Sequence, residues 1–113
     1  MKRYKKGKDM AEIIALTEST YYILLALDSP NHGYGIMQSV EQMSNGRVIL
    51  AAGTLYGALT SMQDKKWIVL LPGESGSRKK EYKLTERGRE VLRMEVKRLK
   101  ELYENGVKVL EEE

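Results

Sequence analysis

The pattern of hydrophobic residues along this chain predicts four helices, one pair of strands and one further minimal strand. The first helix, Tyr21–Leu27, is apolar on nearly every side, so we expect it at the centre of the fold. It follows three hydroxyl-bearing residues suited to an N-cap, Thr17, Ser19 and Thr20. The polar segment 28–31, which contains Pro30, ends it.

A second helix is predicted from His32-Gly33 to Asn45-Gly46, an Asn-Gly pair being typical of a helix C-terminus. Its buried face consists of three residues spaced i, i+4 and i+7: Ile36, Val40 and Met43. The run Arg47–Leu50 that follows is rich in β-branched residues and predicts a minimal strand.

A third helix is predicted over 53–66, with its buried face again spaced i, i+4 and i+7: Leu55, Leu59 and Met62. The opposite face carries mostly small or polar residues: Thr54, Gly57, Ala58, Ser61 and Lys65. Small side chains let a helix backbone approach another surface closely. A helix that enters a DNA major groove, about 12 Å wide, needs such an approach.

A β-hairpin is predicted from strands Trp67–Leu71 and Lys80–Leu84, joined by the glycine-containing loop 72–77. The loop leads into a cluster of three cations. Together with Ser77, they are candidates for contacts with a phosphate backbone: Arg78, Lys79 and Lys80. The alternative is a charged hairpin edge that discourages aggregation.

The last predicted helix begins after Thr85, a suitable N-cap, and carries apolar residues at a 4, 3, 4, 3 spacing from Leu92 to Gly106, ending with Leu110. This seam resembles one side of a coiled coil. It predicts pairing with a second copy of the chain through five residues: Leu92, Val96, Leu99, Tyr103 and Leu110. The alternative is a helix that folds back onto its own domain.

Composition narrows the class of protein. With 113 residues, 42% of them hydrophobic, the chain buries one modest core. It has no cysteine and one histidine, which excludes a disulfide and a Cys/His zinc site. We expect no metal and no cofactor. Its longest apolar run is too short to cross a bilayer and no signal peptide is evident, so we expect a cytoplasmic protein without membrane contact.

The positive charge is unevenly distributed. The net charge is only +3, yet five basic residues lie within the first eight positions, so the remainder of the chain is slightly acidic. A basic arm of this kind suits a polyanion such as DNA, with Lys5 and Lys6 as candidate contacts. The alternative is a solvated tail that only aids solubility.

Four sequence motifs, in order and at short separations, indicate a family. They are Thr20-Tyr21-Tyr22-Ile23-Leu24, His32-Gly33-Tyr34-Gly35-Ile36, Gly53-Thr54-Leu55-Tyr56-Gly57-Ala58-Leu59 and Tyr82-Lys83-Leu84-Thr85-Glu86-Arg87-Gly88. Over about Thr17–Leu99 the chain resembles the PadR family of bacterial transcriptional regulators. The motifs, with the order helix, helix, short strand, helix and hairpin, predict a mainly α protein with a small β-hairpin: a winged helix-turn-helix and a long C-terminal dimerisation helix.

The resemblance implies a homodimeric repressor on a palindromic operator of double-stranded DNA. The third helix and the hairpin, or wing, would contact DNA, and the C-terminal helix would supply the two-fold contact. We therefore divide the chain into a basic arm and lead-in (1–16), a DNA-binding domain (17–84) and a dimerisation helix (85–113). Some short members of the family bind flat aromatic compounds and release DNA. A pocket for such an effector would lie at the dimer interface or under the helices.

Several residues on the predicted reading surface have two interpretations. Tyr56 and Tyr34 either contact DNA or pack, and Thr54, Thr60 and Ser61 either contact DNA or are ordinary solvated positions. His32 is expected in a local turn or cap.

The chain departs from the family pattern at two positions. Gly57 stands where the family often has arginine, and Ala51 stands where it often has a serine cap. We therefore expect few base-specific contacts from the third helix, with DNA shape, the wing and the basic arm adding specificity.

Two other classes of function remain for comparison. An enzyme is not expected, because no nucleophile lies in a recognisable activating motif. The stronger alternative is a winged-helix protein-interaction module that dimerises through its C-terminal helix without binding DNA.

Overall fold

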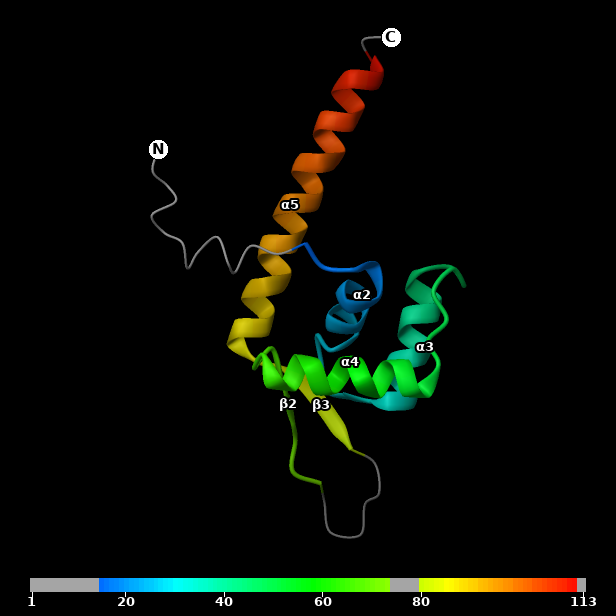
Figure 1. The fold of residues 1–113 in the computed structure, drawn as a ribbon, viewed down its shortest axis with the longest axis vertical. Coiled ribbons are helices and arrows are strands. Elements are labelled where there is room, and N and C mark those ends of the chain that lie inside the picture. The colour runs from blue at the N-terminus through cyan, green and yellow to red at the C-terminus, as the bar shows by residue number, and fades with distance from the viewer. Residues whose placement is uncertain (1–14, 74–79, 112–113) are drawn as a thin grey trace.

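The structure is a computed structural model that describes residues 15–73 and 80–111. Their elements follow in the order α2 (Glu18–Ala26), β1 (Asn31–His32), α3 (Gly33–Met43), α4 (Ala52–Asp64), β2 (Ile68–Leu70), β3 (Glu81–Leu84) and α5 (Glu86–Glu111). The predicted mainly helical fold with a small sheet and a long C-terminal helix is confirmed. Figure 1 shows α5 rising past α2, while α4 crosses below α2 near the strands.

The core forms where the three short helices meet the sheet and the first half of α5. The central position expected for α2 is confirmed, since Ile23, Leu24 and Leu27 are almost fully buried. Full burial of such a side chain stabilises the fold by about 1.5–3 kcal/mol. The other helices and the sheet complete this cluster with Ile36, Val40, Leu55, Leu59, Met62, Ile68, Tyr82, Leu84, Val91 and Leu92.

The end of α3 differs from its predicted packing. Met43 is 40% exposed, whereas Ser44 is buried. The helix stops at Met43 because the chain reverses at Asn45 and Gly46, whose φ angles are 55° and 79°. The buried Ser44 hydroxyl accepts a hydrogen bond from the Val48 amide at 2.9 Å, which fixes the chain after the turn.

The sheet has a third strand that sequence analysis placed elsewhere. Arg47–Leu50 is not a strand, and the two-residue β1 pairs with β3 instead, giving the antiparallel order β1-β3-β2. Val48 and Leu50 pack against the core without strand pairing. A two-residue strand has no periodicity by which the sequence could reveal it.

The first turn of α5 is tied to the base of the hairpin. Thr85 acts as the predicted N-cap, since its hydroxyl accepts a hydrogen bond from the Gly88 amide at 3.0 Å. The same hydroxyl donates to the backbone oxygens of Lys66 and Trp67. A Cβ on Gly88 would overlap the Trp67 carbonyl, so only glycine allows this close approach.

The first part of α5 packs against the other elements of its own domain, whereas the later part is exposed. Leu92, predicted to lie in the interhelical seam, is 8% exposed and belongs to the core of its own domain, because this part of α5 packs on α2 and β3. Beyond Glu95, α5 extends clear of the other labelled elements in Figure 1. No helix in the described ranges is long and apolar enough to span a membrane.

An ion pair between the buried Glu95 and the half-buried Arg98 marks the point where α5 leaves the domain. Both carboxylate oxygens of Glu95 accept hydrogen bonds from Arg98, at 2.8 and 2.7 Å, and one also accepts from the Leu16 amide at 3.2 Å. The Arg98 hydrogen bonds lower the pKa of Glu95 below its ordinary value, with burial acting in the opposite direction. The charged carboxylate therefore fastens the start of the described domain to α5.

The start of α3 is packed tightly under α4. A Cβ on Gly33 would overlap the hydroxyl of Tyr56 and come within 2.8 Å of its Cζ. Similarly, a Cβ on Gly35 would overlap the side-chain oxygen of Asn31. The two glycines therefore have a packing reason that the motif alone did not reveal.

We predict that Gly33→Ala lowers the free energy of unfolding by about 1–3 kcal/mol, because the added methyl must displace the Tyr56 ring. In a Tyr56→Phe background the loss should be smaller, since the hydroxyl is gone. Urea unfolding at fixed protomer concentration measures both effects.

Gly57→Ala provides the control for this prediction. A Cβ at Gly57 meets nothing within 4 Å, so the substitution should raise the free energy of unfolding by about 0.5–1 kcal/mol. An equal loss for Gly33→Ala with and without the Tyr56 hydroxyl would contradict the packing described.

Candidate nucleic-acid interface

One long side of α4 faces away from the core. Burial of Leu55, Leu59 and Met62 on the inner side leaves Thr54, Gly57, Thr60 and Ser61 exposed. Open space lies around Gly53 and Gly57, so no intramolecular contact requires a glycine at either position. Glycine inside a helix costs about 0.5–1 kcal/mol relative to alanine. The outer face of α4 therefore has two positions without side chains, where another surface can approach the helix backbone closely.

The N-terminal end of α4 is suited to an anion. The N-cap, Ala51, provides no side-chain hydrogen bond, as the sequence predicted. Amide N–H groups at such an end carry partial positive charge and favour phosphate. At the other end, the exposed carboxylate of Asp64 is followed by two exposed cations, Lys65 and Lys66. Both ends of α4 therefore offer positive charge, the N-terminal end through backbone amides and the C-terminal end through lysine side chains.

The exposed hydroxyls of α4 differ in what they offer. The Thr60 hydroxyl donates to the Tyr56 carbonyl at 3.0 Å, which leaves it free to accept rather than to donate. Phosphate oxygens require donors. Thr54 and Ser61 are therefore better candidates than Thr60 for contacts to a DNA backbone.

Two tyrosines border this face. Tyr56 is 46% exposed while its hydroxyl lies against Gly33, so it packs and faces solvent at once. Tyr34, in the first turn of α3, is 64% exposed, and its hydroxyl accepts a hydrogen bond from Gln38 at 3.4 Å. Tyr56 thus exposes part of its ring on α4, and Tyr34 is exposed in the first turn of α3, which Tyr56 contacts at Gly33.

The two residues of β1 form hydrogen bonds that hold the start of α3. The His32 imidazole accepts a hydrogen bond from the Gly35 amide at 3.2 Å, which confirms the local cap expected for it. Asn31, which sequence analysis did not single out, accepts from the His32 amide at 2.9 Å. The motif letters alone gave no sign of this role for Asn31.

The wing is described only at its base. Lys80 is exposed just before β3, and Lys83 is exposed on the outer side of that strand. The alternation Tyr82-Lys83-Leu84 could have identified Lys83 as a second outward cation. The candidates Ser77, Arg78 and Lys79, and the arm residues Lys5 and Lys6, lie outside the described residues.

The far half of α5 presents an apolar face. Val96 is 49% and Tyr103 71% exposed, and Leu110 is also exposed, while Leu99 is half-buried. Sequence analysis missed Leu102 and Val109, which are exposed seven residues apart on the flank of the same face. The heptad spacing of these two residues was available as a signal. The face is thus wider than a two-column seam.

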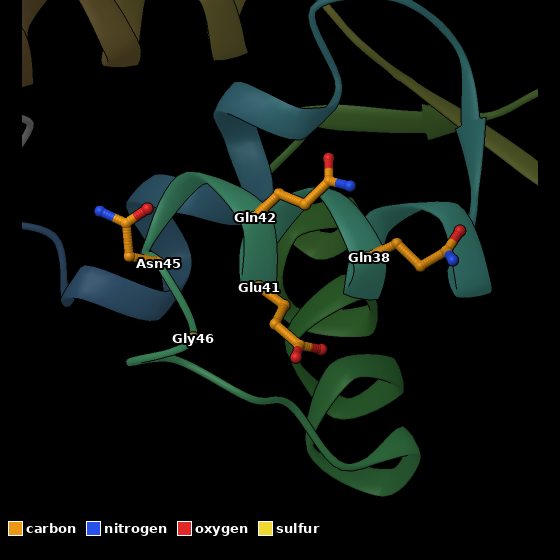
Figure 2. Close-up of a pocket in the computed structure, with 5 residues that line it drawn as sticks. All are labelled: Gln38, Glu41, Gln42, Asn45 and Gly46. Carbon is orange, nitrogen blue, oxygen red and sulfur yellow. The ribbon is translucent and has the colours of Figure 1, made fainter.

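A shallow pocket lies on the outer side of α3. It has a volume of about 500 Å³ and is lined by Gln38, Glu41, Gln42, Asn45 and Gly46. Figure 2 shows its polar side chains diverging from the helix rather than converging on one point. Sites for small molecules combine apolar walls with a few convergent polar groups. This pocket therefore does not match the aromatic effector that the family resemblance implies for some members.

Comparison with known proteins gives sequence and structural relatives. A family model, the transcriptional regulator PadR-like family, matches residues 22–94. A 37.1 kDa protein in transposon TN4556 of Streptomyces fradiae is 42% identical over 74 residues, which cover 65% of this chain. They cover only 20% of the transposon protein.

Solved structures support the same fold. A PadR family transcription regulator from Clostridium difficile is similar with a TM-score of 0.71 and 22% identity, over 83% of this chain and 99% of that one. A PadR-like transcription factor from Bacteroides fragilis has a TM-score of 0.62 and 26% identity, over 94% and 95% of the two chains.

A third structure, Bacillus subtilis PadR in complex with operator DNA, has a TM-score of 0.55 and 21% identity, over 66% of this chain and 44% of that one. Because the family model matches residues 22–94, more than half of the chain, this protein belongs to the PadR-like family of transcriptional regulators.

Proposed function

We propose that this protein is a transcriptional repressor that binds a palindromic DNA operator as a homodimer. The observation that carries the proposal is the outer face of α4, which combines small residues with an N-terminus that has no side-chain cap. A helix that only faced solvent would have no reason to keep two glycines in open space. The structure of Bacillus subtilis PadR, which shares this fold, was solved in complex with operator DNA, which supports DNA as the partner.

The reading helix has few groups that specify a base. Gly57 has no side chain in the middle of the exposed face, and the Thr60 hydroxyl offers only an acceptor. Specificity therefore depends mainly on DNA shape and on contacts from the wing and the basic arm. Lys80 and Lys83 are the described cations of the wing that reach solvent.

The exposed apolar face of α5 is the surface for the second protomer. Exposed apolar side chains at seven-residue spacing are what a partner helix covers in a coiled coil. Gly106 lies on this face in open space, which allows two helix backbones to approach there. Two protomers joined in this way present two copies of α4, as an operator with two-fold symmetry requires. If a flat aromatic effector binds, this interface supplies the apolar walls it needs.

The same face of α5 also favours the alternative of an interaction module that dimerises without binding DNA. That module would need no outward cations on the wing and no smooth face on α4. DNA binding that depends on the wing separates the two functions.

The salt dependence of DNA binding tests the proposal. We expect log affinity for a mixed-sequence duplex to fall steeply with log salt concentration, by about 0.9 unit of slope per phosphate contact. Replacing Arg78, Lys79 and Lys80 by alanine should weaken binding to all sequences and reduce the slope by about one unit for each cation that contacts a phosphate.

The control variant carries alanine at three exposed cations of α5, Arg93, Lys97 and Lys108, and so has the same change in net charge. It should bind nearly as the unmodified protein does. A flat salt response, or equal losses in the two triple variants, would favour the interaction module.

The dimer predicts a specific effect of Leu99→Glu. A charge in the middle of the apolar face should yield monomers in sedimentation experiments and abolish tight operator binding, because the two half-sites are no longer bound together. Asn105→Glu, on the charged side of the same helix, should leave the dimer intact. A Leu99→Glu protein that stays dimeric would refute the interface.

A further inference from the structure

We propose that His32 is a positioning residue for the DNA-contacting surface: its neutral imidazole caps α3 and holds the first turn of that helix, in which Gly33 lies against Tyr56 and from which Tyr34 projects. The inference rests on the proposed DNA-binding function and adds a requirement for the state of one side chain. His32 is the single histidine of the chain, so its chemistry can be isolated by one substitution.

The cap uses an acceptor that only the neutral ring has. Nδ1 of His32 accepts the hydrogen bond of the Gly35 amide at 3.2 Å, in the position that the side-chain oxygen of Asn or Asp takes at an ordinary N-cap. Both ring nitrogens of a protonated imidazole are donors. Protonation therefore removes the cap and places a positive charge at the positive end of the helix dipole.

The contacts around the turn make the cap consequential. Asn31 accepts from the His32 amide at 2.9 Å and lies over Gly35. On the other side, the Tyr56 hydroxyl lies against Gly33, the first residue of α3. The first turn of α3 thus lies in close contact with Asn31 at Gly35 and with Tyr56 at Gly33. A change at His32 is therefore transmitted to Tyr56 and to Tyr34, which belongs to the same turn.

The strand pairing provides an alternative partner for a protonated ring. His32 is directly opposite Glu81 in the β1–β3 ladder, so the two side chains share one face of the sheet. The other titratable groups that the described residues place around β1 and the first turn of α3 are Tyr82 on β3, opposite Asn31, Lys83 next to it, Tyr34 on α3 and Tyr56 on α4, whose hydroxyl lies against Gly33. Attraction to the Glu81 carboxylate draws an imidazolium away from the end of α3, whereas Lys83 opposes its charge.

Three proteins and two pH values test the proposal: the unmodified protein, His32→Asn and His32→Ala, at about pH 7.5 and about pH 5.5, a range in which imidazole takes up a proton. The probe is a mixed-sequence duplex at constant low salt. At the higher pH, His32→Asn should bind like the unmodified protein, because its side-chain oxygen replaces Nδ1. His32→Ala should bind about fivefold more weakly per protomer, the equivalent of one lost cap.

At the lower pH, the unmodified protein should lose about fivefold in affinity relative to His32→Asn, which keeps its cap. A merely structural role for the residue would give no such difference in pH response. Equal pH responses of these two proteins would overturn the proposal. Tighter binding of the unmodified protein at the lower pH would also overturn it, since that result indicates a direct contact between imidazolium and phosphate.

Urea unfolding of the same proteins without DNA separates the effect of the cap on stability from its effect on DNA binding. The midpoint of the unmodified protein should fall relative to that of His32→Asn as the pH is lowered, because the capped fold requires the neutral ring. If that shift occurs but none of the three proteins binds DNA, the cap is real and the proposed function fails, together with the role of His32 in it. If DNA binds without any shift in the midpoints, the positioning role alone is overturned.

Discussion

The arrangement of this protein depends on the burial of one side of α4. Leu55, Leu59 and Met62 anchor the helix to a core built by α2, α3 and the sheet, and 3.6-residue periodicity then fixes which residues point outward. The open positions at Gly53 and Gly57 follow from that anchoring. A different rotation of α4 would bury the small face and expose the leucines, and the domain would lose both its core and its binding surface.

Two tight contacts connect this anchored helix to the remainder of the molecule. At one end of the domain, Tyr56 closes over Gly33 and so joins α4 to α3. At the other, Gly88 fits against the Trp67 carbonyl and joins the hairpin to α5, the helix that we propose for dimerisation. The position of the reading helix is therefore set by two close contacts at glycines, one with a tyrosine ring and one with a backbone carbonyl. Such a connection suits a protein that must place two reading helices at a fixed separation on DNA.

Much of this fold was predictable because it rests on strong local signals. The periodicity of the apolar residues located α4 and the long α5, although it assigned Leu92 to the interhelical seam rather than to the core, and Thr85 was recognisable as an N-cap. The pairing of β1 with β3 was not predictable, because two residues carry no period and their partner is far along the chain. The reasons for Gly33 and Gly88 were equally hidden, since each depends on a contact with a residue more than twenty positions away.

The candidate surface was likewise predictable from the sequence only where local helix geometry determines it. Exposure of Thr54 and Ser61 was implied by helix geometry, whereas the hydrogen bond from the Thr60 hydroxyl to the Tyr56 carbonyl and the role of Asn31 required three-dimensional coordinates.

We propose above all that a symmetric dimer reads DNA with two copies of α4. Selection of bound duplexes from a random-sequence pool tests it most directly. The account predicts an enriched palindrome whose half-site centres are about one helical turn, or a multiple of it, apart. Enrichment of no sequence, or of a site without two-fold symmetry, would contradict it.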